Sequence, residues 1–312
     1  MDVLLSYINT QLFIFALKLV RYQSNRTITA SFPYNNYIIA CDGGWIASPN
    51  SVKQIAGVGS WSTITYGYGK YIIGGGNGYI STSGNGINWT APKQVGNKVW
   101  RDIIYANGKF VIVGGAGNIS TSIDGETWTT PIQIVTGDYG GIGWYGITYG
   151  NGNFLAVDGI NGLITTSTDG ANWTTPKSVG IPYLYAATYN NGTFLVTGSG
   201  GKISTSTDGT NWTPIQIGTS AWNGIAFGDG VFIVAGGAGY SISADYGKTW
   251  TTPRKVGMYG WSTITYSHGT FIAAGSEGYS MSTDKGTTWT TPTLFTDTSG
   301  NKLFISKICP IP

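Results

Sequence analysis

Apolar and polar residues alternate in short runs along this chain, and the same order of runs returns several times. One unit starts with an alternating run at residues 100–105, turns at Asn107-Gly108 and continues with an apolar run at residues 110–113. Asn-Gly pairs tolerate the positive φ angles of two-residue hairpin loops. An uninterrupted apolar run predicts a strand buried on both faces. An Ile-Ser-Thr-Ser run and a run that begins at Trp128 follow, so each unit predicts four antiparallel strands.

The unit recurs about every 40 residues, which indicates a repeat architecture. A weaker first copy at residues 37–48 matches residues 71–82, and residues 302–308 alternate like one more strand. Seven four-stranded sheets close around an axis as a β-propeller. We expect an all-β fold, a seven-bladed β-propeller of four-stranded antiparallel blades, over residues 26–312. Blade one is divergent, and the C-terminal strand should close the ring beside it. Six copies end at Trp89, Trp128, Trp173, Trp212, Trp250 and Trp289.

Residues 1–25 differ from the repeats. Residues 3–20 are mostly apolar, and a helical stripe of apolar positions runs through them. Asp2 opens the segment, where a secretory signal carries positive charge. We expect a short N-terminal helix over residues 1–25 that tethers the propeller to other subunits. An uncleaved membrane anchor is the alternative, although polar residues interrupt the middle of the segment. The stripe consists of Leu5, Ile8, Leu12, Phe15 and Leu19.

Charged residues make up only 10% of the chain, against roughly 25% in an average soluble protein. The formal net charge of +3 comes from scattered Lys and Arg, which excludes the basic stripe of a nucleic-acid-binding protein. A polar surface with few charges favours an extracellular or virion-associated protein. The sequence contains no Cys/His cluster of the kind that binds a metal, and no glycine-rich stretch precedes a predicted helix as a phosphate loop would. We therefore expect no metal and no cofactor.

The two cysteines leave two interpretations open. Cys41 lies in the first copy and Cys309 in the last predicted strand. They are either buried free thiols or the partners of one disulfide that closes the ring, which requires Cα atoms within about 7 Å.

Each later copy also carries a turn with a fixed polar residue. Residues 243–250 and 282–289 read S-x-D-x-G-x-T-W, and blades three to five have a version that is one residue shorter. These turns resemble the Asp-box of the BNR (bacterial neuraminidase repeat) β-propeller family. The resemblance implies that the Asp side chain accepts backbone N–H groups and that the Trp packs beneath the blade. Asn85 takes the place of Asp in blade two. The structural Asp-box residues are Asp124, Asp169, Asp208, Asp245 and Asp284.

This resemblance does not fix the function, since the family includes sialidases, other glycosidases and glycan-binding proteins. A sialidase of this family needs three arginines for the substrate carboxylate, and the repeats contain only Arg101 and Arg254. A glycosidase needs two carboxylates across the scissile bond. Asp158 and Glu277 occupy equivalent loops, but solvated loop carboxylates are the simpler interpretation. We expect no catalytic residues and no enzymatic activity.

A second set of aromatic residues opens the inner strands, after the loops that lie opposite the Asp-boxes in propellers of this type. These side chains are either wedges between blades or platforms that stack on sugar rings. The candidate glycan-binding residues at these positions are Trp61, Trp100, Arg101, Asp102, Trp144, Tyr145, Tyr185, Trp222 and Trp261.

The sequence thus favours a non-enzymatic, lectin-like recognition propeller. The residue pattern of the repeats resembles that of phage tail and bacterial surface propellers, and this resemblance implies display on a larger assembly. Its partner would be a glycan or a surface protein of a host or neighbour, bound through the face opposite the Asp-boxes. The alternatives are a glycoside hydrolase or lyase that uses carboxylates near the axis, and a purely architectural subunit.

Overall fold

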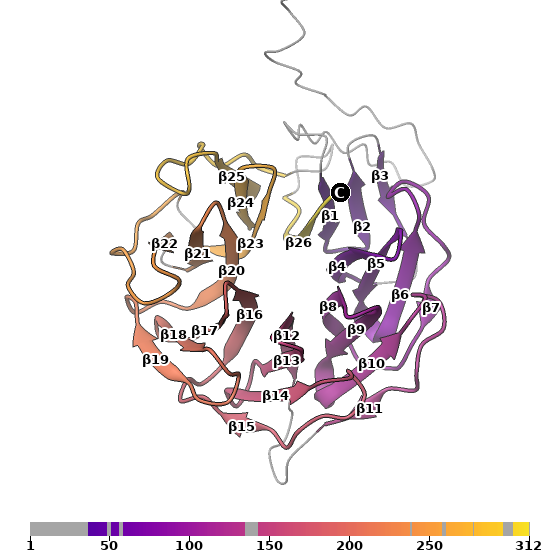
Figure 1. Ribbon diagram of the computed structural model, residues 1–312. Helices are drawn as coiled ribbons and strands as arrows, with labels where there is room; N and C mark the ends of the chain where they lie inside the picture. Colours follow the sequence, from indigo (N-terminus) through magenta and orange to yellow (C-terminus); the bar gives the residue numbers. More distant parts are fainter. Residues whose placement is uncertain are drawn as a thin grey trace, which may run out of the picture.

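Seven antiparallel β-sheets follow one another around a central axis in the computed structural model (Figure 1). The structure describes residues 37–48, 51–55, 59–134, 143–237, 239–257, 260–276, 278–295 and 302–311. The all-β, seven-bladed propeller expected from the sequence is confirmed. The helix expected over residues 1–25 lies outside the described residues.

In blades two to seven, the first strand of each sheet lies nearest the axis and the others follow outward in chain order. Blades two to four consist of β4 (Trp61–Gly67), β5 (Lys70–Gly75), β6 (Tyr79–Ser83), β7 (Lys93–Gln94), β8 (Trp100–Ala106), β9 (Lys109–Gly114), β10 (Asn118–Ser122), β11 (Ile132–Gln133), β12 (Trp144–Gly150), β13 (Asn153–Asp158), β14 (Leu163–Ser167) and β15 (Lys177–Ser178). Blades five to seven consist of β16 (Leu184–Asn190), β17 (Thr193–Gly198), β18 (Lys202–Ser206), β19 (Thr213–Gln216), β20 (Trp222–Gly228), β21 (Val231–Gly236), β22 (Gly239–Ser243), β23 (Trp261–Ser267), β24 (Thr270–Gly275) and β25 (Gly278–Ser282). Short 3₁₀ turns η1 (Gly76–Gly78) and η2 (Gly115–Gly117) join the second and third strands of blades two and three.

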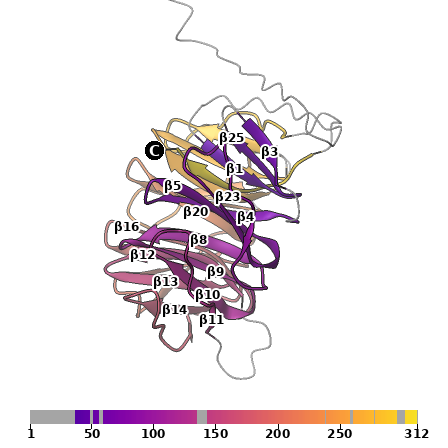
Figure 2. The same ribbon diagram turned by 90° about the vertical axis from the view of Figure 1, so that its right-hand side faces the viewer.

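Blade one is built from both ends of the described chain. Its order is β26 (Ile305–Pro310), β1 (Tyr37–Cys41), β2 (Trp45–Ser48) and β3 (Ser51–Gln54), so the C-terminal strand is the innermost one. Figure 2 shows the yellow C-terminal strands beside the indigo strands of blade one. Ile39 and Ile305 of this blade share a core cluster with Ile272 and Ala274 of blade seven. The prediction that the tail closes the ring beside blade one is confirmed.

The disulfide between Cys41 and Cys309 is not formed. Both thiols are free and buried. The strand register pairs Cys309 with Ile38 and Cys41 with Ile305, and the two cysteines belong to separate core clusters on opposite faces of the sheet. Adjacent strands do not bring side chains on opposite faces together. Burial raises the pKa of Cys309 to about 12, so this thiol stays protonated.

The tryptophans that open the inner strands are wedges between blades, and the alternative that they stack on ligands is wrong. All five are at most 1% exposed. The indole Nε1 of Trp100 donates to the carbonyl of Gly78 in the preceding blade at 3.1 Å, and Trp144 donates in the same way to Gly117 at 3.2 Å. A buried indole N–H needs such a partner. The buried set is Trp61, Trp100, Trp144, Trp222 and Trp261.

The repeated polar turns have the geometry that the Asp-box resemblance implies. In blade four, Asp169 Oδ1 accepts the backbone N–H groups of Ala171 and Asn172, both at 2.8 Å. Gly170 packs against Val111 of blade three, where an added Cβ would lie 3.1 Å from a methyl carbon. The turns of blades two, three, six and seven lie against the preceding blade in the same way, whereas a Cβ added at Gly209 of blade five would meet Phe194 of its own blade. Asn85 holds the same turn in blade two through its Oδ1.

Blade five departs from its siblings in the outer strand. In the other Asp- or Asn-turn blades, a buried hydroxyl of the third strand bonds to the segment that follows the turn tryptophan, as Ser241 Oγ does to the Thr251 carbonyl at 2.7 Å. Blade five has one residue fewer after Trp212, and Ser204 pairs with Pro214 in an unbroken ladder. The Ser204 hydroxyl is consequently buried without a hydrogen-bond partner.

These two serines give a matched test of the blade-five ladder. We expect Ser241→Ala to lower the free energy of unfolding by about 1–2 kcal/mol, because a buried hydrogen bond is lost. Ser204→Ala should leave it unchanged or raise it slightly, because an unsatisfied buried hydroxyl is removed. Urea unfolding of both variants measures this. Equal losses in the two variants would contradict the description of blade five.

The lowered pKa values of the Asp side chains in the Asp turns predict that the folded protein becomes less stable in acid. Hydrogen bonds from Thr249 lower the pKa of Asp245 to about 2, and hydrogen bonds from Thr288 lower the pKa of Asp284 to about 2. Backbone N–H bonds hold the pKa of Asp169 well below its usual range. An unfolded Asp titrates near pH 3.9. The stabilisation is therefore complete above about pH 4 and is lost as the pH falls toward 2.

We expect a variant with Asn at all five Asp positions to show a smaller decrease of Tm between pH 5 and pH 2.5 than the wild type. Asn85 indicates that Asn keeps the turn. Asp169→Ala should have a lower Tm at pH 7 than Asp169→Asn. Differential scanning calorimetry measures both effects. An unchanged acid slope in the fivefold variant would rule out this origin.

Candidate ligand-binding face

The two faces of the ring are built from different segments. The loops that lead into the inner strands and the turns between second and third strands, such as residues 95–99 and 115–117, lie on one face, which we call the tryptophan face. The hairpins between first and second strands and the Asp turns lie on the other, the Asp-turn face. The candidate site lies on the tryptophan face, at the residue that follows each inner-strand tryptophan.

That second position joins neighbouring blades in three places. Ser62 Oγ donates to the carbonyl of Trp100, Asn223 Nδ2 donates to Trp261 at 2.8 Å, and Ser262 Oγ donates to Ile305 at 3.0 Å. The position lies at a register shift in each inner strand, as between Trp100 and Asp102. A bulge of this kind turns the side chain away from the regular ladder.

Blades three, four and five place larger side chains at the same position: Arg101, Tyr145 and Tyr185. All three are half-buried. The Arg101 guanidinium carbon lies 4.0 Å from the centre of the Tyr145 ring, a cation–π contact. Burial, followed by the neighbouring Tyr145 and Tyr183, raises the pKa of Tyr185. The three side chains therefore form one arc across three blades, which we call the Arg-Tyr arc.

Tyr183 adds backbone strain beside this arc. It is 49% exposed and has a φ of 54° directly before β16. The other non-glycine residues with positive φ among the described residues recur at equivalent turns of at least two blades. An L-residue in this conformation costs on the order of 1–2 kcal/mol, and such outliers gather at functional sites.

The strand that follows Tyr185 is also less covered than its siblings. From Tyr185 to Asn190 every residue of β16 is partly exposed, whereas the inner strands of blades two, three, four, six and seven have buried residues at their third and fourth positions. At the fourth position those five strands carry Ile, where blade five has Ala187. The smaller side chain leaves this part of the inner edge of blade five more open to solvent.

Asp102 does not join the arc. It is 8% exposed, and its carboxylate accepts bonds from Thr63 Oγ1 at 3.2 Å, the Ile147 backbone N–H at 3.1 Å and Lys307 Nζ at 3.0 Å. Lys307 lies on β26, so this ion pair connects blades one and three near the axis. Asp102 is thus a structural group, and its prediction as a ligand contact is not supported by this geometry.

The other carboxylates of the repeats that the structure describes also have partners. Asp158 is fully buried and accepts the backbone N–H groups of Gly143, Ile160 and Asn161 at 3.0, 3.1 and 2.7 Å. Glu126 pairs with Lys70 at 2.7 Å on the surface. Glu277 lies outside the described residues. The described part of the chain contains no group of three or more His, Cys, Asp or Glu residues that could hold a metal ion.

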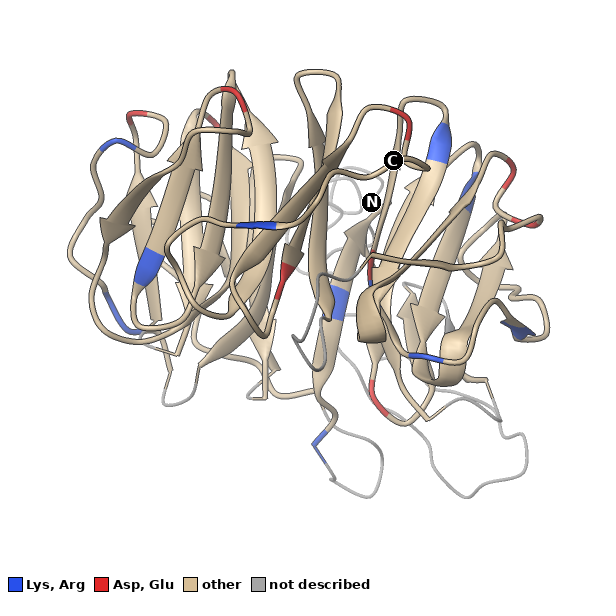
Figure 3. Ribbon diagram, turned by 90° about the horizontal axis from the view of Figure 1, so that it is seen from below, with Lys and Arg blue, Asp and Glu red and all other residues tan. Residues whose placement is uncertain are grey.

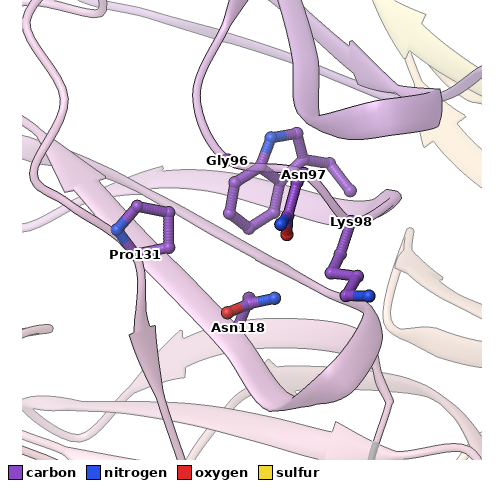
Figure 4. Close-up of a pocket in the computed structure, with 6 residues that line it drawn as sticks. Gly96, Asn97, Lys98, Asn118 and Pro131 are labelled. Atoms are coloured by element: carbon purple, nitrogen blue, oxygen red, sulfur yellow. The ribbon is translucent and has the colours of Figure 1, made fainter.

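A small pocket lies nearby on the tryptophan face (Figure 4). It has a volume of about 270 Å³ and lies between the loop before β8 and the start of β10. Asn97, Lys98 and Asn118 line it. Asn118 Nδ2 already donates to the Gly115 carbonyl at 2.9 Å, and Trp100 contributes only a 1% exposed side chain. The pocket therefore offers polar groups but no exposed aromatic face.

Charge is sparse over the whole molecule. Figure 3 shows Lys, Arg, Asp and Glu scattered singly over the ribbon. Within the described ranges, no helix is long and apolar enough to cross a membrane.

Sequence comparisons find no matching family model and no matching curated protein. Several solved structures resemble the fold at low identity. Virginiamycin B lyase from Staphylococcus aureus has a TM-score of 0.60 and 16% identity, over 71% of this chain and 80% of that chain. YCF48 from Cyanidioschyzon merolae has a TM-score of 0.58 and 16% identity, over 80% and 93%. The computationally designed Ika8 protein has a TM-score of 0.57 and 8% identity, over 83% and 92%. These similarities show the β-propeller fold.

The structure therefore divides the residues selected from the sequence into two groups. The five tryptophans and Asp102 hold the ring together, while half-buried Arg101, Tyr145 and Tyr185 are brought into one arc. The candidate residues chosen from the sequence did not include Lys307 or Tyr183. Lys307 could not be found in this way because its partner, Asp102, is 205 residues away. In the sequence, the arc could have been recognised because the residue after the wedge position is large in blades three to five, where other blades have Ser or Asn.

Proposed function

We propose that this protein is a non-enzymatic recognition propeller of the Asp-box type that binds a glycan through the Arg-Tyr arc of the tryptophan face. One observation carries the proposal: the second position fastens the next blade in three blades, but in three consecutive blades it presents half-buried Arg101, Tyr145 and Tyr185. Among the described residues these three side chains form no hydrogen bond to the next blade, which leaves their polar groups available for recognition.

The chemistry of the arc suits sugars. Tyrosine rings supply rigid contact area at low entropic cost and a hydroxyl for hydrogen bonding. Tyr183 and the partly exposed strand β16 extend the surface beside Tyr185. Hydrolysis finds less support, because Asp102 and Asp158 already accept three hydrogen bonds each.

The proposal also includes the assembly on which the propeller is displayed. A chain with 10% charged residues and a surface rich in Asn, Thr, Ser and Tyr suits display on a phage tail or a bacterial surface structure. Residues 1–25 would attach the propeller to neighbouring subunits of that assembly.

A glycan array probed with the full-length protein tests this function. We expect bound glycans to lose about tenfold in affinity with Tyr145→Leu or Tyr185→Leu, the size of an aromatic contact of roughly 1.5 kcal/mol. Tyr68→Ser is the matched control, because Tyr68 is 66% exposed on the opposite face. Thermal unfolding confirms that each variant is folded.

The outcomes are distinct. Affinity that depends on Tyr68 and not on Tyr145 or Tyr185 would assign recognition to the Asp-turn face. A wild-type protein that binds no glycan on the array would refute glycan recognition.

A further inference from the structure

Arg101 is the charged group of the Arg-Tyr arc, and its guanidinium lacks hydrogen-bond partners. Its Nε is buried without a hydrogen-bond partner. Among the described residues, its one recorded interaction is the contact with the Tyr145 ring at 4.0 Å. A guanidinium has five N–H donors, and stacking on a ring face leaves the in-plane donors without acceptors.

The nearest carboxylate in sequence does not neutralise Arg101. Asp102 is paired with Lys307 at 3.0 Å and also accepts bonds from Thr63 and Ile147. The charges of Asp102 and Lys307 cancel locally, and the positive charge of Arg101 remains.

Asp158 does not supply a counter-charge by direct contact either. The backbone N–H groups of Gly143, Ile160 and Asn161 engage its carboxylate inside blade four. Gly143 lies between this carboxylate and the arc, since a Cβ added there would lie 3.1 Å from the Tyr145 ring. Ion pairs described in the structure use other residues: Lys70 with Glu126, and Lys307 with Asp102.

We infer that the ligand of the arc is an acidic saccharide whose anionic group binds Arg101. This inference rests on the glycan recognition proposed above and adds the charge of the ligand. The guanidinium edge forms paired N–H···O bonds with a carboxylate or a sulfate, while Tyr145 and Tyr185 contact the sugar ring. Tyr145 holds the guanidinium plane in place, so little side-chain entropy is lost on binding.

Pairs of glycans that differ only in charge test the inference. The array should include uronate glycans with their methyl esters, and sulfated glycans with their unsulfated parents. We expect the acidic member of a pair to bind about ten- to a hundredfold more tightly, the range for a hydrogen-bonded charge. The carboxylate and sulfate pairs identify which anion the site takes. The affinity should also fall with added salt.

Variants separate charge from shape. Arg101→Gln should remove the preference for the acidic member, and Arg101→Lys should keep part of it, since Lys retains the charge without the planar fork. Arg254→Gln is the matched control, because Arg254 is exposed on the outer part of blade six. The salt dependence of wild-type binding gives an answer even if an Arg101 variant unfolds.

Failure of this inference and failure of the proposed function look different. If neutral and acidic members bind equally and Arg101→Gln changes nothing, the anion site is refuted while glycan recognition stands. If neither member of any pair binds, glycan recognition itself fails.

Discussion

The structure depends on how each inner strand is held to the next, because a propeller blade buries its faces only against its neighbours. Along most of the ring, chain continuity keeps neighbouring blades close. The chain also continues from blade seven into β26, so the ring closes inside blade one, where β26 pairs with β1 although the two strands are far apart in sequence. Between blades seven and one, Ser262 Oγ donates to the Ile305 carbonyl, as Ser62 Oγ donates to the Trp100 carbonyl between blades two and three. The C-terminal strand therefore takes part in the ordinary contact between blades.

This requirement determines which residues are free for recognition. The indole of Trp100 must fill the gap before its blade, and its N–H must reach the Gly78 carbonyl. Most of the Asp turns lie against the preceding blade. At the second position, by contrast, a hydrogen bond to the next blade is not required: Arg101 contacts Tyr145 of blade four through its guanidinium instead, and the ring stays closed. The side chain at this position can therefore differ from blade to blade.

Much of the fold follows from the sequence alone, because period, turn chemistry and strand burial are local signals. The Asn-Gly hairpins, the Asp turns and the alternating tail each predicted the element that forms. Features that depend on side-chain direction or on distant partners did not follow. Leucine fills the wedge position in blade five as Leu184, fully buried, which shows that the site needs bulk rather than an aromatic face. Cys41 and Cys309 lie on adjacent strands but on opposite faces, and only the register reveals it. Lys307 forms an ion pair with Asp102 near the axis, and the two residues are too far apart in sequence for a local pattern to predict it.

The sparse charge of the surface gives Arg101 its importance. On a protein with many ionised groups, one guanidinium adds little to the field at a binding face, since nearby carboxylates and salt screen it. Here charged residues are 10% of the chain, and Asp102, the neighbour of Arg101 in sequence, is already paired with Lys307. Half-burial beside Tyr145 lowers the local dielectric and strengthens any hydrogen bond that the guanidinium makes. A neutral ligand would gain only ordinary hydrogen bonds from this arrangement, whereas an anion gains charge-assisted ones. The arc thus discriminates by the charge of its ligand through one residue, while the rest of the ring remains chemically uniform.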